Sequence, residues 1–248
     1  MPDRSSGPFV SIVIPTFRRP DRLLRALGSL LDQDLTEWEA LVIDDGDGEG
    51  IAAARELDDE RIRARPSAGT GQVDARSTAI GLASGTFICW LDDDDWWSDP
   101  EHLSLLCSAA HERRFFYRGG WMVHEDSGGA EIGRDAFDHE ASARSLQRDN
   151  TILTSSIAYP RVAHRELGLL DRELGGYCDW DFMLRMCNAG FEPVKLPGLG
   201  VCYAIHDSNL SSDYDAPPRR RNFERFKAKH QLDVELANHE RIHKMLTG

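Results

Sequence analysis

The first hundred residues alternate between short apolar runs and amphipathic segments, and this alternation restricts the fold more than any other feature. The run "FVSIVIP" (residues 9–15) is rich in β-branched residues and ends at a proline, as expected of a buried parallel strand. The next segment, "DRLLRALGSLLDQ" (21–33), repeats its apolar residues at i, i+3, i+4 and i+7, which is the spacing of an amphipathic helix. Together they predict a βα unit.

The same pattern recurs along the chain. The runs "WEALVI" (38–43) and "TFICWL" (86–91) are further strong strands, and helical segments lie between them. Strands that alternate with helices predict an α/β protein with a Rossmann-like, mostly parallel sheet flanked by helices. Because ligands bind at the carboxyl ends of such strands, three loops should converge: "PTFRR" (15–19), "DDGDG" (44–48) and "DDDDWW" (92–97).

The second half is less regular. The spacing predicts helices over 101–114 and 178–190, strands over 114–126 and 151–160, and one final basic helix from about Arg219 to Met245. Gly190 is expected to cap the helix that begins at Cys178. The region from about Arg118 to Arg172 carries no motif that indicates a function.

Composition excludes several classes of protein. The 248 residues, 41% of them hydrophobic, are enough for one large domain, and five dispersed cysteines without a CxxC pair or a secretory signal favour a reducing cytoplasm. Since no apolar run approaches the roughly 18 to 20 residues that span a bilayer, we expect a protein that is not integral to a membrane but can dock at its inner face. The net charge of −13 argues against binding to nucleic acid. Residues 216–248 nevertheless hold eight Lys or Arg against four acids.

Four consecutive carboxylates, Asp92 to Asp95, follow the third strong strand. Their mutual repulsion amounts to a few kcal/mol per close pair at an effective dielectric of about 20, so a cation is expected among them, most simply a divalent metal. The alternative is a solvated acidic turn. A second acidic loop, Asp45 to Glu56, matches the acid spacing of an EF-hand, but an EF-hand loop must follow a helix and this one follows a strand. A phosphatase of the haloacid dehalogenase type, with Asp45 as nucleophile, is a further alternative. Such an enzyme usually needs a lysine between its first and last acidic motifs, but the first lysine of this chain is Lys195.

Taken in order, four segments resemble the motifs of the family 2 glycosyltransferases, which have a GT-A fold. They are "SIVIPTFRRPDRLLRALGSLLDQDLTEWEALVIDDGDGEG", "DARSTAIGLASGTFICWLDDDDWWSDP", "GLLDRELGGYCDWDFMLRMCNAGF" and "HDSNLSS", and they cover about residues 9 to 212. The resemblance implies a GT-A domain over 1–212, with a nucleotide-sugar half at about 9–115 and an acceptor half at about 116–212. Residues 213–248 would form a basic helical tail.

The resemblance also implies which residues bind the nucleotide sugar: Pro15, Thr16, Arg18, Asp44, Asp45, Arg76, Asp92, Asp93 and Asp94. Asp45 would accept the N3 hydrogen of a uracil ring, whereas Asp44 has the alternative of forming an Asx-type turn. Arg76 matches an arginine that approaches the diphosphate. The alternative role for Arg76 is that of an ordinary charged residue on a helix surface.

The Asp run matches a DxD-type motif, which binds ribose and a Mg²⁺ or Mn²⁺ that carries the diphosphate. Asp94, Asp95 and His206 are the expected metal ligands, and Asp92 is expected to have a structural role. Hard oxygen ligands suit both metals. Trp96 and Trp97 either form a wall of the sugar site or pack under the next helix.

Asp179 matches the carboxylate that acts as general base in inverting members, with an ordinary charge at a helix N-terminus as the alternative. Asp181 is the rival base or a charge on the helix surface. The family therefore implies metal-dependent, inverting transfer of a sugar from a nucleotide-diphosphate donor, expected to be a UDP-sugar, to an unknown hydroxyl acceptor.

Two rival functions are a nucleotidyltransferase and a nucleotide- or metal-binding module without turnover. The first would favour a glycine-rich loop and a lysine after the first strand, which "IPTFRRPDR" does not contain. Donor hydrolysis with Mn²⁺ would exclude the second. The basic tail is expected to contact anionic lipid headgroups or a neighbouring subunit of a homo-oligomer, and the alternative is a solvated helix face.

Overall fold

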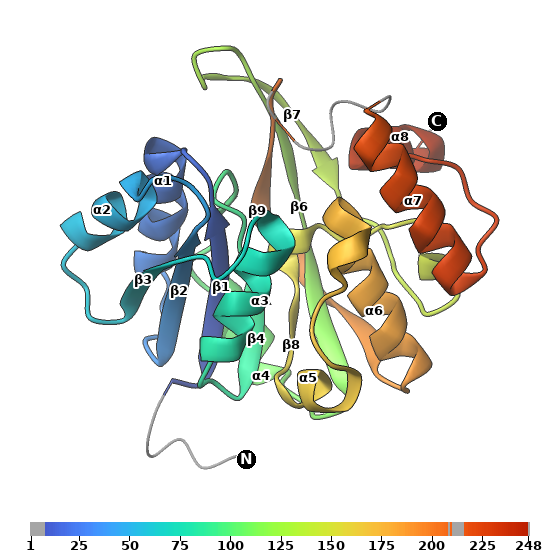
Figure 1. Ribbon diagram of the computed structural model, residues 1–248, viewed down its shortest axis with the longest axis horizontal. Helices are drawn as coiled ribbons and strands as arrows, with labels where there is room; N and C mark the ends of the chain where they lie inside the picture. The colour runs from blue at the N-terminus through green and yellow to red at the C-terminus, as the bar shows by residue number, and fades with distance from the viewer. Residues whose placement is uncertain (1–7, 208, 210–215, 248) are drawn as a thin grey trace.

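The computed structural model describes residues 8–207, 209 and 216–247, and within them nine strands form a single sheet (Figure 1). The strands are β1 (Val10–Thr16), β2 (Trp38–Asp44), β3 (Ile62–Pro66), β4 (Phe87–Trp90), β5 (Trp96–Trp97), β6 (Arg114–Glu125), β7 (Glu131–Phe137), β8 (Ala158–Pro160) and β9 (Glu192–Ile205). The helices are α1 (Pro20–Leu31), α2 (Glu49–Glu56), α3 (Gln72–Leu82), α4 (His102–Ser108), α5 (Val162–Leu167), α6 (Cys178–Asn188), α7 (Pro217–His230) and α8 (His239–Thr247).

The strand order is β3-β2-β1-β4-β8-β6-β9-β5, with β7 paired to β6 outside this path. The first four strands are parallel, as the sequence predicted, because a helix after each of β1, β2 and β3 returns the chain to the edge where the next strand begins. The remaining strands are mixed: β8 is antiparallel to β4 and β6, whereas β6 and β9 are parallel. The prediction of a mostly parallel sheet therefore holds for the N-terminal half of the sheet.

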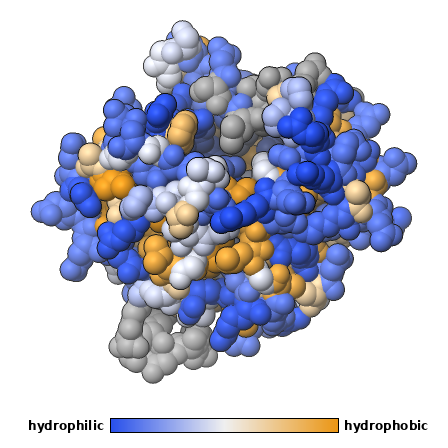
Figure 2. Space-filling view, viewed as in Figure 1, coloured by the Kyte–Doolittle hydropathy of each residue, from blue (hydrophilic) through white to orange (hydrophobic). Residues whose placement is uncertain are grey.

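Alternate side chains of β1 face the two layers of helices. Val10, Ile12 and Ile14 belong to a core with α1 and α4, whereas Val13 belongs to a second core with α3, α6 and α7. All four side chains are fully buried, which explains why this strand is apolar on both faces. Figure 2 shows that this face of the molecule is mostly hydrophilic, with apolar residues gathered below its centre.

Several predicted elements differ from those observed. The helix predicted at 101–114 ends at Ser108, and the strand predicted at 151–160 is a 3₁₀ turn at Thr154–Ser156 followed by the short β8. The sequence indicated a strand-like run around Cys202, but the full length of β9 and the strand β7 were not predicted. The single final helix was also wrong: α7 ends where Gln231 adopts a left-handed conformation with φ 54°, and α8 begins at His239.

The C-terminal helices pack on the body of the same chain, beside α6 and away from α1 and α2 (Figure 1). Phe226 of α7 is fully buried and lies 4.5 Å from Trp180 between ring centroids. The Lys229 ammonium is 2.7 Å from carboxylates of both Asp171 and Asp181. The basic tail thus meets acids of its own chain, and its contacts with lipid or a second subunit stay predictions.

In the part of the chain that the structure describes, none of the helices combines the length and the apolar character needed to cross a membrane. The boundary predicted at residue 212, and most of the loop predicted at "HDSNLSS", lie outside the described residues.

Candidate active site

The loops that follow β1, β2 and β4 converge, as the sequence predicted. Thr16, the last residue of β1, donates a hydrogen bond of 2.8 Å from its hydroxyl to Asp93 Oδ2 in the loop after β4. Asp45, in the loop after β2, accepts 2.5 Å from the backbone N–H of Gly71, just before α3. The three strand ends therefore form one edge, where helix N-termini and loop groups can meet a ligand.

The first loop contains both buried and exposed residues. Pro15 and Thr16 are buried, so Thr16 supports Asp93 rather than facing solvent. Arg18 is exposed in a left-handed conformation with φ 54°, and its Nε lies 3.4 Å from Asp47 Oδ2. Phe17 beside it is 51% exposed. The sequence prediction did not include Phe17, although an aromatic residue in a ligand-binding loop is a signal for stacking on a base.

The two acids of the second loop have different roles. Asp44 is 4% exposed, and its two oxygens accept hydrogen bonds from the backbone N–H groups of Gly46 at 2.7 Å and Ile51 at 3.2 Å. Asp44 thus forms the turn that the sequence left open as its alternative. Asp45 is half-buried, so it is the acid of this pair that can reach a ligand.

Each carboxylate of the Asp run has its own partner. Asp92 Oδ1 lies 2.5 Å from Nη2 of Arg76, which is only 3% exposed and also contacts Cys178 Sγ at 3.7 Å. Although burial opposes ionisation of Arg76, the charge of Asp92 raises its pKa well above the usual value. Arg76 is therefore not a charge on the helix surface. The Asp92 side chain is 18% exposed, so its predicted roles, structural or nucleotide-binding, stay predictions.

Asp94 and Asp95 point in different directions. Asp94 Oδ2 lies 2.5 Å from Nη1 of Arg19 and 3.2 Å from Nε2 of His206. Asp95 is 1% exposed, and its oxygens accept from the Ser155 hydroxyl at 2.5 Å and from the backbone N–H of Ala204 at 3.0 Å. The expectation that Asp95 lies beside the metal is therefore wrong for this structure, because Asp95 is turned into the core.

The surroundings also separate these acids by pKa. Burial raises the pKa of Asp92, although the Arg76 charge opposes this. Burial and the charge of Asp94 raise the pKa of Asp93 to about 7. Burial and the neighbouring Asp charges also raise that of Asp95. For Asp94 burial acts in the same direction, but the hydrogen bond from His206 and the charge of Arg19 outweigh it and lower the pKa. Asp94 is thus the member of the run most firmly held as an anion.

Asp94 and His206 are two possible metal ligands that the structure brings together. A guanidinium already stands at the Asp94 oxygen as a cation, and a His nitrogen faces the same oxygen. Among the described residues, no group of three or more His, Cys, Asp or Glu side chains is arranged to hold a metal. Two protein ligands are sufficient for Mg²⁺ or Mn²⁺ only if water and phosphate oxygens supply the rest, which is how Mg²⁺ is usually bound.

Asp179 lies in the first turn of α6, where the helix dipole favours a carboxylate. It is 8% exposed, and its Oδ2 accepts a hydrogen bond of 2.6 Å from the hydroxyl of Thr154. Its charge contributes to the pKa values of Arg76 and Asp92, so it belongs to the same cluster. Thr154 was not predicted, because only the tertiary structure brings its 3₁₀ turn to α6.

One predicted role of Asp181, a charge on the helix surface, requires an exposed side chain, and the structure does not show one. Its side chain is fully buried and contacts Arg185, Lys229 and His230. These three partners make it a structural anion. Its role as the rival base has no support in this geometry, because a base must reach a substrate.

The two tryptophans after the Asp run have separate environments. Trp97 is buried, donates 2.8 Å from its indole N–H to the backbone oxygen of Ser155, and packs on His102 with ring centroids 4.8 Å apart. Trp96 is half-buried under the guanidinium of Arg25, which lies 3.9 Å from its ring centroid. Trp97 therefore packs under the next helix, as one of the two predicted alternatives stated.

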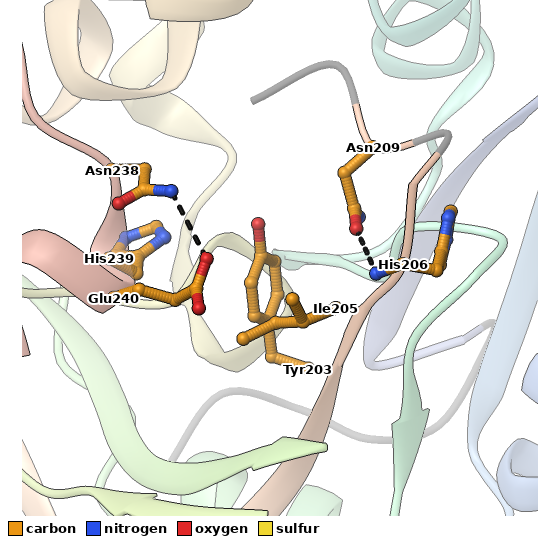
Figure 3. Close-up of a pocket in the computed structure, with 7 residues that line it drawn as sticks. All are labelled: Tyr203, Ile205, His206, Asn209, Asn238, His239 and Glu240. Carbon is orange, nitrogen blue, oxygen red and sulfur yellow. Dashed lines mark hydrogen bonds between the residues drawn. The ribbon is translucent and has the colours of Figure 1, made fainter. Parts of the chain in front are cut away.

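A small cavity of about 20 Å³ adjoins His206 (Figure 3). One side is formed by the end of β9 and the residues after it, and the other by the start of α8. Its lining residues are Tyr203, Ile205, His206, Asn209, Asn238, His239 and Glu240. The C-terminal segment, which the sequence placed in a separate tail, therefore lies beside the candidate site.

Solved structures with a similar fold include complexes with nucleotide sugars. S. aureus TarS (residues 1–349) in complex with UDP-GlcNAc matches with a TM-score of 0.71 and 18% identity, over 95% of this chain and 69% of that one. The mannosyltransferase PcManGT from Pyrobaculum calidifontis, in complex with GDP-Man and Mn²⁺, matches with a TM-score of 0.67 and 15% identity, over 98% of this chain and 69% of that one. At these identities the likeness concerns the fold, which is the GT-A fold.

Sequence comparison agrees with the fold. A protein of Bacillus subtilis (strain 168) with the name "Uncharacterized glycosyltransferase YwdF" is 28% identical over 229 residues, which is 90% of this chain and 84% of that protein. The family model described as glycosyl transferase family 2 matches residues 11–167. This chain therefore belongs to glycosyl transferase family 2, and it is a glycosyltransferase.

Proposed function

We propose that the enzyme transfers a sugar from a nucleotide-diphosphate donor to an acceptor hydroxyl, with inversion and with the help of Mg²⁺ or Mn²⁺. The observation that carries this proposal is the position of Asp179, a nearly buried carboxylate in the same cluster as Arg76 and Asp92. Both structural neighbours were solved in complex with a nucleotide sugar, UDP-GlcNAc in one and GDP-Man in the other. We take a UDP-sugar as the first donor to test.

Residues of the three converging loops would hold the donor. Asp45 would accept a hydrogen bond from the base, and Arg18 and Phe17 are exposed in the neighbouring loop. Asp94 and His206 would hold the metal. When bound, the metal supplies positive charge that stabilises the departing diphosphate.

Asp179 would act as the general base. Its carboxylate accepts the proton of the acceptor hydroxyl while that oxygen forms a bond to the anomeric carbon and the bond to the diphosphate oxygen breaks. Because the incoming oxygen approaches opposite the leaving group, the single displacement inverts the anomeric centre. The hydrogen bond from Thr154 orients the carboxylate of Asp179 during this step.

The test is Asp179→Asn, with Asp181→Asn as the matched control two residues along the same helix. We measure the rate at which UDP is released when the sugar of a UDP-sugar is transferred to a glycoside acceptor or to water. This rate should fall by about 10²- to 10⁴-fold in Asp179→Asn, while the affinity for UDP with Mn²⁺ stays unchanged. The folded fraction of Asp181→Asn should retain turnover. Near-normal turnover of Asp179→Asn would remove the proposed base, and nucleotide binding without turnover in the natural protein would indicate a binding module.

We propose a cytoplasmic location at the inner face of the membrane, with α7 toward anionic headgroups. Arg220, Arg221 and Arg225 are exposed on this helix, and all five cysteines are unpaired. Co-sedimentation with phosphatidylglycerol vesicles should fall when the three arginines are changed to Gln. Equal recovery of the natural protein and the Gln variant with the vesicles would contradict this proposal. A difference in mass between these two proteins in light scattering would indicate that α7 contacts a second subunit of a homo-oligomer instead.

A further inference from the structure

Arg76 of α3 joins the Asp run to the first turn of α6. Its Nη2 lies 2.5 Å from Asp92 Oδ1, and its Nη1 lies 3.7 Å from the Sγ of Cys178. Cys178 is the first residue of α6 and immediately precedes Asp179. One guanidinium therefore contacts both the loop after β4 and the helix that carries the proposed base.

The guanidinium of Arg76 is held inside the protein. Its side chain is 3% exposed, and its Cζ lies 5.3 Å from the ring centroid of Trp90, which is 1% exposed. Burial opposes its ionisation, but the charges of Asp92, Cys178 and Asp179 raise its pKa above the usual value, so it stays a cation. A cation this deeply buried acts on the groups that it touches, because little of its surface is left for a ligand to contact.

A second path connects the same two parts of the site. The backbone N–H of Asp92 donates a hydrogen bond of 3.0 Å to the hydroxyl of Ser155, and the hydroxyl of Thr154 donates one of 2.6 Å to Asp179 Oδ2. Thr154 and Ser155 are neighbours in the 3₁₀ turn before β8. The turn orients the carboxylate of Asp179, whereas Arg76 holds the start of the helix that carries it. Together the two paths fix both the orientation and the position of Asp179 relative to Asp92.

We propose that Arg76 is a positioning residue for Asp179: it fixes the first turn of α6 against the Asp run, so that the base lies at the correct distance from the bound donor. The inference rests on the proposed function, since it needs Asp179 as the base. It differs from the role that the sequence suggested, a contact with the donor diphosphate, because both Nη atoms of Arg76 are directed to Asp92 and Cys178. A rigid, planar guanidinium suits a residue that sets a distance between two elements.

The experiment is a double-mutant cycle of Arg76→Gln, Asp179→Asn and the protein that carries both changes. The kcat for UDP release from a UDP-sugar is measured per folded molecule, and the affinity for UDP with Mn²⁺ is measured by calorimetry. Arg118→Gln is the matched control, because Arg118 is also 3% exposed and lies 2.7 Å from an aspartate, Asp99, which belongs to neither the Asp run nor α6. Arg76→Lys keeps the charge, and it takes the place of Arg76→Gln in the cycle if the latter does not fold.

We expect Arg76→Gln to lower kcat by about 10- to 100-fold, the loss that a shift of about 1 Å in a reacting group can cause, while the affinity for UDP changes by less than about threefold. The kcat of Arg76→Lys should lie between those of the natural protein and Arg76→Gln. Added to Asp179→Asn, Arg76→Gln should lower kcat by less than about threefold more, since the group that it positions is already gone. The kcat of Arg118→Gln should stay within about threefold of the natural value.

Other outcomes would overturn the inference in identifiable ways. A loss of UDP affinity in Arg76→Gln without a loss of kcat would assign Arg76 to the donor diphosphate. Equal losses of kcat in the natural and the Asp179→Asn backgrounds would show that Arg76 does not act through Asp179, and the proposed base would stand. An equal loss in Arg118→Gln would show a general effect of removing a buried charge. Near-normal turnover of Asp179→Asn would remove the proposed base itself, and the inference would fail with it.

Discussion

Asp181 is the buried carboxylate whose replacement we expect to weaken the fold most clearly. Its side chain is fully buried, and it lies 2.8 Å from Arg185 Nε, 2.7 Å from Lys229 Nζ and 2.8 Å from His230 Nε2. Two of these partners belong to α7, so the contact joins the C-terminal helix to the helix that carries Asp179. Asp181→Asn keeps the shape but removes the charge.

The expected loss of stability follows from what remains after the substitution. Removal of one partner of a buried ion pair costs about 3 to 5 kcal/mol when the other charge stays buried. Here Lys229 and Arg185 are 33% and 18% exposed, so both can regain some water. We therefore expect a loss of about 2 to 3 kcal/mol, which for a chain of this size lowers the melting temperature by about 4 to 12 °C.

The difference should depend on pH in a defined direction. Burial raises the pKa of Asp181, but hydrogen bonds from His230 and Lys229 and the charge of Arg185 outweigh this and lower it below the usual value. A carboxyl group with a lowered pKa in the folded state stabilises the fold above its unfolded pKa of about 3.9, and this contribution is lost as the pH falls through the folded value. The gap between natural protein and Asp181→Asn should thus be complete at neutral pH and shrink below about pH 4.

Thermal and urea unfolding of both proteins at pH 7 and at pH 3 to 4 would measure this. Asp171→Asn is the control, since Asp171 also contacts Lys229 but is one-third exposed, and surface pairs contribute about 1 kcal/mol at most. A melting temperature of Asp181→Asn within about 1 °C of the natural protein at pH 7 would refute the reasoning.

Three further outcomes are expected. Gly85→Ala should lower the free energy of unfolding in urea by about 1 to 3 kcal/mol, because a Cβ there would lie 2.7 Å from a backbone nitrogen of β1. Gly81→Ala in α3 has open space around the new Cβ and should raise that free energy by up to about 1 kcal/mol. Equal stabilities of the two variants would contradict this. Burial and the charge of Arg118 lower the pKa of His102 to about 3. Its contribution to the free energy of unfolding should therefore fall by about 1.4 kcal/mol for each pH unit as the pH is lowered from about 6.5 toward 3. The free energy of unfolding of His102→Gln should decline less steeply over the same pH range. Thr154→Val should lower kcat by about tenfold with unchanged UDP affinity if it orients Asp179, and a changed affinity alone would argue otherwise.

Local pattern was enough to predict the parallel half of the fold and the edge where the site lies. A strand buried on both faces must be apolar throughout, and a helix on its surface must repeat its apolar residues every three to four positions, so both are visible in a short stretch of sequence. The convergence of the loops after β1, β2 and β4 then follows from parallel strands having their carboxyl ends at one edge.

The partners of individual charged side chains were decided by the tertiary structure. Asp94 and Asp95 are adjacent in sequence, yet Asp94 faces Arg19 and His206 whereas Asp95 is held by Ser155 and the backbone of residue 204. Nothing in the run "DDDD" distinguishes them, because the partners come from segments far away in the chain. The same is true of α7, whose buried phenylalanines and Lys229 pack against α6, a contact that the basic composition of this segment does not reveal. Hydrophobic periodicity is a local property of the chain, whereas the neutralisation of a buried charge depends on whichever distant groups the fold brings within a few ångströms.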